Sequence, residues 1–307
     1  MSYLKNSVPA GFDEASILPK DSNKALNWQQ ENRTWWENHP MRYDWKNELV
    51  YEEFTKAFYE EIDKRFFCNA ERYMKWDKIP FSNLINFDDL KDKKVLEIGV
   101  GNGSHAQLLA QHSKSYTGID LTNYAVKSTS ERMQCFNLKA DIIQMDAENM
   151  KFDDNTFDFI WTWGVIHHSS NTNNILKEMN RVLKPGGRAV TMVYHHSFWN
   201  YYIISGLVYG VFLGKILKTK SIHKIRQLIN DGAIARFYTI PEWDKIVSEL
   251  FVVEKTLVCG QKEAVILLPG GKFKDFVISV IPDSFTRFVS NSLKQGEFLV
   301  TKLHKPG

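Results

Sequence analysis

The sequence has little that would direct it to nucleic acid or to an oxidising compartment. Its 307 residues carry a net charge of only +3, too small to indicate a nucleic-acid surface. Its three cysteines, Cys68, Cys135 and Cys259, are odd in number and far apart, which suits a reducing cytosol better than a disulfide framework. The first residues lack the charged and then apolar run of a signal peptide, and there is no internal repeat or low-complexity tract. We therefore expect a cytoplasmic globular protein.

The N-terminal part, residues 1–90, is predicted to be an arm followed by a helical cap. Residues 1–26 are polar and contain Pro9, Gly11 and Pro19, which is typical of a loosely ordered segment. Residues 45–67 are predicted to form one long amphipathic helix. Its apolar positions are Leu49, Phe54, Phe58, Ile62 and Phe66.

The stretch WWENHPMRYDW, residues 35–45, has two interpretations. Its rings form core, in a cap packed over the edge of a sheet, or they form a lid whose aromatic faces close over a cationic ligand. The sequence does not say which ring would touch a ligand.

From residue 91 to residue 307, predicted strands and helices alternate, and the strands are continuous apolar runs. This pattern predicts an α/β fold with a mostly parallel sheet covered by helices on both faces. The predicted strands are 93–100, 115–121, one within 140–150, 157–168, 187–196, 251–259 and 296–305. The predicted helices between them include 104–113, 122–137 with Thr122 as N-cap, and 171–187 ended by Pro185 and two glycines.

Three glycines follow the first of these strands at alternate positions, in the stretch VLEIGVGNGSH. Glycine loses more backbone entropy on folding than other residues, so three of them together indicate positions where φ must be positive or where a ligand comes very close. The place itself, beyond a strand and before a helix, is where open α/β sheets bind ligands. The spacing is Glu97-x-Gly99-x-Gly101-x-Gly103, and Ser104 stands where a dinucleotide fingerprint has its third glycine.

This spacing resembles the class I S-adenosylmethionine-dependent methyltransferases. The resemblance covers residues 93–195 and, more faintly, the last two strands, and it implies a Rossmann-like sheet with a terminal antiparallel strand. It implies that Glu97 lies near the cofactor's amino group, that Asp120 binds the ribose, and that Asp146 binds the adenine amino group. The other implied cofactor residues are Gly99, Gly101, Gly103, Leu121, Ala147, whose backbone N–H is available, and Trp163. The segment RVLKPGG, Arg181–Gly187, is similar to the family's signature after the fourth strand.

Taken singly, each of these residues has an ordinary structural explanation. Gly101 could belong to a simple turn, Asp120 could cap a helix, and Asp146 could form an Asx-turn. The five matches in the family's order favour S-adenosylmethionine binding over five separate coincidences.

Methyl transfer to oxygen or nitrogen needs a base, and four histidines lie where one could act. His167 and His168 follow the fourth predicted strand, and His195 and His196 follow the fifth. The segment GVIHH is similar to a loop of methyltransferases that act on sugar hydroxyls and to a loop of tRNA wobble-uridine methyltransferases. We expect His168 to be the base, with His195 as second choice and His167 as a further candidate. The alternative is that these rings pack against their loops. No cysteine joins them, so no metal site is expected.

Residues 197–250 are predicted to be an insertion after the fifth strand that covers the substrate. Its first part, 197–214, has no charge and carries Gly206, Gly210 and Gly214, with a basic run after it. Alone, this reads as a membrane helix. Since the chain must return to the same sheet, we expect a helix buried under a substrate lid in preference to a span or to contact with a membrane surface.

The predicted function is transfer of a methyl group from S-adenosylmethionine to a small-molecule acceptor, most simply a hydroxyl oxygen. A tRNA acceptor is the alternative within the same chemistry, and nucleic acid is not the expected partner because the net charge is low. A cofactor-binding partner subunit without catalysis is an alternative of a different kind.

Overall fold

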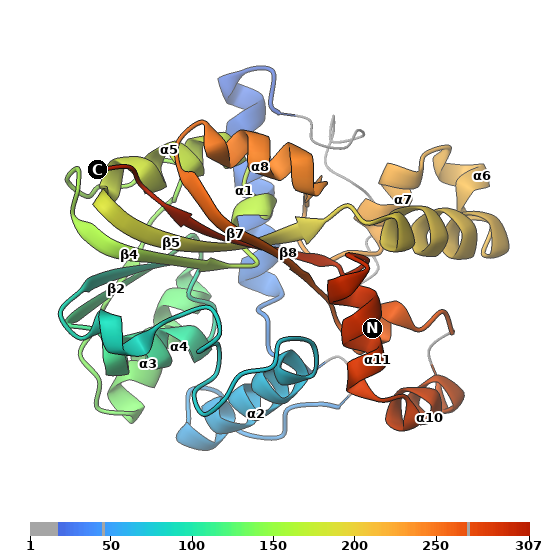
Figure 1. The fold of residues 1–307 in the computed structure, drawn as a ribbon, viewed down its shortest axis with the longest axis horizontal. Coiled ribbons are helices and arrows are strands. Elements are labelled where there is room, and N and C mark those ends of the chain that lie inside the picture. The colour runs from blue at the N-terminus through green and yellow to red at the C-terminus, as the bar shows by residue number, and fades with distance from the viewer. Residues whose placement is uncertain (1–17, 45–46, 269–270) are drawn as a thin grey trace.

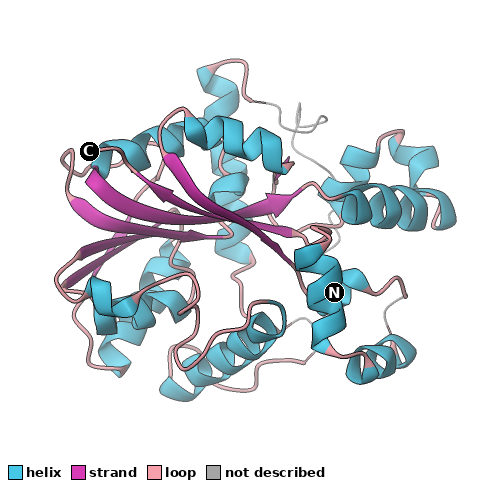
Figure 2. Ribbon diagram, viewed as in Figure 1, coloured by secondary structure: helices cyan, strands magenta, loops and turns pink. Residues whose placement is uncertain are grey.

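The computed structural model describes residues 18–44, 47–268 and 271–307, and it contains one central sheet (Figures 1 and 2). The strands lie in the order β3-β2-β1-β4-β5-β8-β7, and the two-residue β6 pairs with β5. Their bounds are β1 Lys94–Ile98, β2 Ser115–Asp120, β3 Asp141–Gln144, β4 Phe157–Trp163, β5 Leu183–His195, β6 Phe237–Tyr238, β7 Val252–Cys259 and β8 Phe298–His304.

The sheet is parallel except at β8, which confirms the predicted fold class. Strand β1 pairs in parallel with β2 and with β4, so that Leu96 lies between Thr117 and Ile160. Strand β8 runs antiparallel between β5 and β7. The predicted strands are therefore all present, and the carboxyl ends of β1 to β5 reach the same edge of the sheet.

Helices cover both faces, as the apolar strands predicted. Along β1, Val95 packs into a core with α2 and α3, and the next residue, Leu96, packs into the opposite core with α5 and α8. The helices are α1 Ser22–Asn38, α2 Lys56–Tyr73, η1 Phe87–Leu90, α3 Ser104–His112, α4 Asn123–Cys135, η2 Ile166–His168, α5 Thr172–Val182, η3 Trp199–Phe212, α6 Lys215–Thr219, α7 Ile222–Leu228, α8 Ile240–Ser248, α9 Lys262–Val265, α10 Lys272–Val280, α11 Asp283–Arg287 and η4 Phe288–Ser292.

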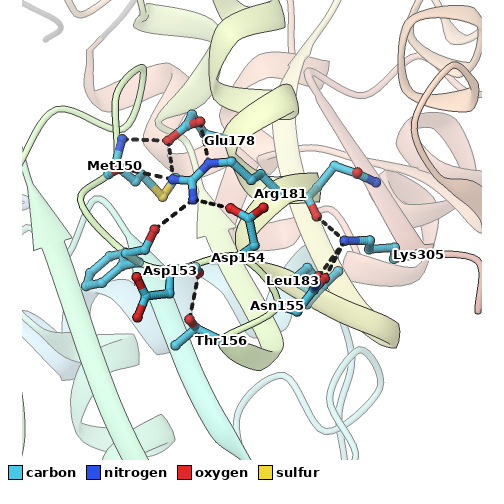
Figure 3. A network of polar contacts seen from close by, with 11 residues as sticks. Met150, Asp153, Asp154, Asn155, Thr156, Glu178, Arg181, Leu183 and Lys305 are labelled. Atoms are coloured by element: carbon cyan, nitrogen blue, oxygen red, sulfur yellow. Dashed lines mark hydrogen bonds and ion pairs between the residues drawn. The ribbon is translucent and has the colours of Figure 1, made fainter.

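The helix before β5 was predicted to be ended by Pro185 and two glycines, and it ends slightly earlier, because α5 stops at Val182 and β5 starts at Leu183. Pro185 disfavours helical backbone in the residue before it, and Gly186 has a positive φ of 72°. The helix end is closed by Lys305, whose Nζ donates to the backbone oxygens of Asn180 and Leu183 (Figure 3).

Arg181, the first residue of RVLKPGG, ties the end of α5 to the loop between β3 and β4. Its guanidinium pairs with Glu178 and Asp154, and it donates to the backbone oxygen of Met150 (Figure 3). In this chain Arg181 therefore fixes the loop at the amino edge of the sheet.

The long helix predicted for residues 45–67 starts later than expected. Residues 45–46 lie outside the described part, and α2 begins at Lys56, where Thr55 accepts a hydrogen bond from the Phe58 backbone N–H at 3.3 Å. Phe54 has a positive φ of 66°, which no helix residue can adopt. The buried positions Phe58, Ile62 and Phe66 do form the predicted apolar face. The cap Thr122 of α4 is also as predicted, accepting from the Ala125 backbone N–H.

The stretch 197–250 contains two kinds of structure. Helices η3, α6 and α7 extend beyond the sheet, whereas β6 and α8 are part of the main body, because Trp243 and Val247 are buried against the sheet. Among the described residues no helix is both long and apolar enough to cross a bilayer.

We expect the buried pair of Arg132 and Asp63 to hold α2, α4 and the glycine loop together. Arg132 is fully buried, pairs with Asp63, and donates to the backbone oxygen of Asn102 at 3.0 Å. Asp63→Ala leaves this guanidinium without its charge partner, and the free energy of unfolding should fall by about 3 kcal/mol. Urea denaturation measures this.

The matched control is Glu60→Ala on the same helix, whose ion pair with Lys56 is exposed. Its loss should cost less than about 1 kcal/mol. Equal losses in the two variants would contradict the assigned role of Asp63.

Candidate cofactor and acceptor site

A cavity of about 770 Å³ lies at the carboxyl edge of the sheet. Its walls include the residues that follow β1, β2, β3 and β4, part of β5 and the start of β8. Helices α1 and α2, from the N-terminal part of the chain, also contribute to its walls. Its volume is within the range of sites that bind small molecules and cofactors.

The backbone of the glycine loop, residues 99–103, forms part of the cavity wall. Gly99 has a φ of 81°, and a Cβ there would lie 2.2 Å from the Val165 side chain. Gly101 has a φ of 54°, and an added Cβ would have no atom within 4 Å. Both line the cavity, so a ligand can lie directly against the backbone at Gly101. Gly103 does not line it and is instead the N-cap of α3.

Asp120 ends β2 and lines the cavity. One carboxyl oxygen accepts from the backbone N–H and the hydroxyl of Thr122, at 3.0 and 2.9 Å. The other accepts from the Gly101 backbone N–H at 3.3 Å. Burial raises the pKa of Asp120, and these hydrogen bonds lower it by a smaller amount. The adjacent Leu121 also lines the cavity. A carboxylate held in this way is suited to accept from two neighbouring hydroxyls.

Asp146 lines the same cavity after β3, together with Ala147. Its Oδ1 accepts from the Glu148 backbone N–H and from Gln29 Nε2, each at 2.9 Å. Burial raises the pKa of Asp146. The hydrogen bond from Gln29 joins the cap to the site where the family would hold adenine.

Glu97 lies beneath the cavity and not in its wall. It is 1% exposed, and its Oε2 accepts from the Tyr116 hydroxyl at 2.6 Å. Burial raises the pKa of Glu97 to about 8, although the Tyr116 hydrogen bond lowers it. His105 lies 3.9 Å from Glu97 Oε1 and does line the cavity. Burial, followed by the charge of Arg132, lowers the pKa of His105 to about 3, so this ring is neutral.

Trp163, the last residue of β4, presents its ring to the cavity. The ring stacks on that of Trp161, with an interplanar angle of 4° and a centroid distance of 5.4 Å. This stacking gives the cavity a rigid aromatic wall next to the glycine loop.

Helix α1 closes the carboxyl edge through hydrogen bonds as well as rings. The carboxyl of Glu37 accepts from the first backbone N–H groups of α4, at 2.8 and 3.0 Å. Asn32 donates to the backbone oxygen of His168, and Gln29 accepts from the backbone N–H of Ser170. Sequence reasoning missed these polar residues of α1, because their hydrogen-bond partners lie more than 80 positions further along the chain.

The aromatic stretch 35–45 contributes to the wall of the cavity and also packs within the cap. Trp36, Pro40, Met41 and Tyr43 line the cavity, and Trp45 lies outside the described residues. The edge of the Trp36 ring meets His168 at a centroid distance of 5.0 Å.

The four histidines lie in different environments, and of these only His168 lines the cavity. Its Nδ1 lies 2.7 Å from the backbone oxygen of Ile234. His167 is fully buried, and burial holds its pKa well below the usual value. His195 bonds through Nδ1 to the backbone oxygen of Gly296 at 2.9 Å, and burial lowers its pKa. His196 packs its ring on Tyr201.

A polar group that the sequence did not reveal lines the other end of the cavity. It consists of Tyr194, Arg226, Asp231, Glu263 and Glu297. Burial raises the pKa of Glu297 to about 7, against the lowering effect of the Arg226 charge. Glu297 directly precedes β8, and Arg226 comes from α7, so the group assembles from segments far apart in the chain.

Metal binding has no ligand set in the described ranges, 18–44, 47–268 and 271–307. No group of three His, Cys, Asp or Glu side chains there is arranged to hold an ion.

Comparison with known proteins identifies the fold. A family model described as a methyltransferase domain matches residues 96–191, which include the glycine loop, Asp120, Asp146 and His168. Residues 96–191 of this chain therefore match a methyltransferase domain, and the whole sheet has the class I methyltransferase fold. S-adenosylmethionine is the cofactor that this family implies.

Curated proteins match this chain over the same region. A phthiotriol/phenolphthiotriol dimycocerosates methyltransferase of Mycobacterium tuberculosis is 39% identical over 101 residues, 32% of this chain and 37% of the relative. A fatty-acid O-methyltransferase of Mycolicibacterium smegmatis is 34% identical over 101 residues, 32% of this chain and 36% of the relative. The match thus spans little more than a third of these relatives.

Solved structures share the fold over more of the chain. An S-adenosylmethionine-dependent methyltransferase of Methanosarcina mazei superposes with a TM-score of 0.51 at 19% identity, covering 75% of this chain and 99% of that one. A Haloferax volcanii putative methyltransferase, in complex with the Trm112 activator, gives a TM-score of 0.51 at 14% identity, covering 80% and 93%.

We expect Asp120→Ala to weaken binding of S-adenosylhomocysteine by about 1–3 kcal/mol, because two buried ribose hydroxyls lose their acceptor. Isothermal titration calorimetry measures this. Asp141→Ala, at the exposed start of β3, is the control and should bind as the parent does. An unchanged affinity in Asp120→Ala would remove Asp120 from the ribose site.

A second prediction concerns the pH dependence that Glu97 gives to stability. Its pKa is about 8 in the folded chain, above the unfolded value of 4.5. Between these values the folded state holds the extra proton, so Glu97 makes stability fall as the pH rises from 5 to 8. In Glu97→Gln this fall should be smaller by about 3 kcal/mol, measured by denaturant unfolding across that range.

Glu178→Gln provides the control of opposite sign. The hydrogen bond from Arg181 lowers the pKa of Glu178, so its stabilisation is present above the unfolded pKa and is lost only as the pH falls further. This variant should keep the parental slope between pH 5 and 8. A parental slope in Glu97→Gln as well would show that Glu97 is ionised in the folded chain.

Proposed function

We propose that this methyltransferase transfers the methyl group of S-adenosylmethionine to a hydroxyl oxygen of a small-molecule acceptor, with His168 as the base. The observation that carries the proposal is a single cavity with two chemically different ends. Gly101, Asp120 and Asp146 line one end, and Tyr194 and Glu297 line the other.

The strand order supports this division of the cavity. Asp146, Asp120 and Gly99 follow β3, β2 and β1, which are consecutive at one side of the sheet. A cofactor that spans these three strands, at about 4.8 Å a strand, leaves the part over β4, β5 and β8 for an acceptor. His168 follows β4, at the border between the two parts.

The residues present fit the cofactor. The backbone at Gly101 has open space where any other residue would carry a Cβ, and Asp120 presents a carboxyl oriented by three hydrogen bonds. S-adenosylmethionine supplies a methyl group on a sulfonium that is already a good leaving group. The chain's own task is then to align the acceptor and to remove its proton.

The hydrogen bond of His168 supports its assignment as this base. Its Nδ1 faces the backbone oxygen of Ile234, a hydrogen-bond acceptor, so Nδ1 carries the proton and Nε2 is the basic nitrogen of the neutral ring. As the acceptor oxygen forms its bond to the methyl carbon, its hydroxyl proton passes to Nε2. Trp36 and Tyr194 hold the ring on two sides, with centroid distances of 5.0 and 5.4 Å.

The acceptor end is lined by groups that can bind a hydroxyl. Tyr194, Arg226 and Glu297 lie there, and a hydroxyl can both donate to and accept from such side chains. The relatives' names specify a fatty-acid O-methyltransferase and a phthiotriol/phenolphthiotriol dimycocerosates methyltransferase, and we infer the hydroxyl class of acceptor for this chain.

The covered site also favours a small acceptor over tRNA. Helices α1 and α2 and the segment 226–231 all contribute walls to the cavity. A non-catalytic partner subunit would need no aligned base, and the detection of any methylated product would exclude that function.

We expect His168→Ala to lower turnover by roughly 10²–10⁴, because a hydroxyl is a very weak acid and loses its base. Affinity for S-adenosylhomocysteine should stay within about twofold, since Asp120 and Asp146 are untouched. Rates of product formation across pH, with acceptor conversion followed by mass spectrometry, should lose the acidic limb of the profile.

His195→Ala is the matched control, because this ring follows the adjacent strand and lies outside the cavity wall. It should turn over at near the parental rate once folding is verified by cofactor binding. Near-full turnover in His168→Ala would refute the base, and a loss in His195→Ala alone would transfer the role to His195.

A further inference from the structure

The exposed apolar side chains of this protein are concentrated at one end. Fourteen of the twenty large apolar side chains that are exposed in the described residues lie in two segments, 198–217 and 267–293. Val211, Phe212 and Leu217 are 61%, 73% and 81% exposed, and Phe273 and Phe276 are 68% and 62% exposed. Single exposed apolar residues are common, but a gathering of this size marks a surface that is covered by something else.

The charge of the first segment is all of one sign. Residues 197–230 contain Lys215, Lys218, Lys220, Lys224 and Arg226 and no aspartate or glutamate. Since the whole chain has a net charge of +3, the rest of it is net negative. Lys218 and Lys220 are exposed beside Leu217, so the basic and apolar groups share one surface.

The two segments lie at the same end of the molecule. Figure 1 shows α6 and α7 at the end of the long axis, with α10 and α11 at that end as well. Trp199 holds the first segment against the two residues that flank the second: its backbone N–H donates to Gln295 at 3.0 Å, and its ring N–H donates to the backbone oxygen of Ala264 at 3.2 Å. We call segments 198–220 and 267–293, without the undescribed residues 269–270, the apolar–basic end.

We propose that the apolar–basic end docks on the surface of an anionic lipid bilayer. Exposed phenylalanine and leucine side chains at such a surface enter the boundary between headgroups and acyl chains, and lysines beside them meet anionic headgroups. Self-association through this end would bring two sets of lysines together, which opposes a second copy as the occupant. Docking here is at the surface, since η3 has only 14 residues.

Docking would set the acceptor half of the cavity close to the lipid. Arg226, on α7, and Asp231 line the cavity just after the first segment, and Glu263 lines it just before the second. An amphiphilic acceptor in the bilayer would then have a short path to the cavity.

The test is flotation of the full chain with vesicles of phosphatidylcholine alone or with about one third phosphatidylglycerol. We expect binding to the anionic vesicles that weakens at high salt. Phe212→Ser with Leu217→Ser, and separately Lys218→Glu with Lys220→Glu, should each reduce the bound fraction at least about tenfold. The control is Val50→Ser with Lys139→Glu, an equally exposed apolar and basic pair outside the apolar–basic end. It should bind within about twofold of the parent.

Affinity for S-adenosylhomocysteine, measured on every variant, shows that each is folded and does not depend on methyl transfer. Absence of binding to anionic vesicles, or an equal loss in the control, would overturn the proposal. So would a concentration-dependent dimer in light scattering that Phe212→Ser with Leu217→Ser abolishes, because the surface would then be filled by a second copy.

Discussion

The parallel pairing of β1 with β2 and β4 is the constraint on which the site depends. Parallel strands end at the same edge of the sheet, so the loops that follow them lie close together in space although they are far apart in the sequence. Gly99, Asp120, Asp146 and His168 are brought to one cavity by this geometry alone. Helices α3 and α4 begin at the same edge, where the first backbone N–H groups of a helix have no partner within the helix.

Closure of that edge depends on α1, a helix that precedes the first strand and does not connect two strands of the sheet. Helix α1 contacts the chain after β2, β3 and β4 through Glu37, Gln29 and Asn32. Each of these side chains satisfies a group that the sheet leaves unpaired, such as the first backbone N–H groups of α4. The cap therefore belongs to the site itself, and Gln29 even occupies an oxygen of Asp146.

Burial decides the chemistry of the titratable groups more than their mutual charges do. Burial is the largest influence on the pKa of Glu97, His105, Asp120 and Glu297. His105 is therefore neutral, and the raised pKa of Glu97 favours its protonated form, so Arg132 is the charged group buried at the glycine loop. At the acceptor end, Arg226 and the carboxyls around it keep a polar environment, so the two ends of one cavity suit different ligands.

The sequence by itself determined the strands, their order along the chain and the acids at or near their ends, because each of these is a local pattern of a few residues. Gly99 and Gly101, Thr122 and the apolar positions of α2 from Phe58 to Phe66 are of this kind. Local pattern was less accurate at the ends of helices: α5 ends at Val182, shortly before the predicted stop at Pro185, and α2 starts only after Phe54, whose positive φ the apolar spacing does not reveal. The sequence favoured His168 over its neighbour His167, and only the tertiary structure showed that His168 lines the cavity while His167 is fully buried. The tertiary structure also decided that Glu297, Arg226 and α1 belong to the site, because those contacts join segments separated by tens to hundreds of residues.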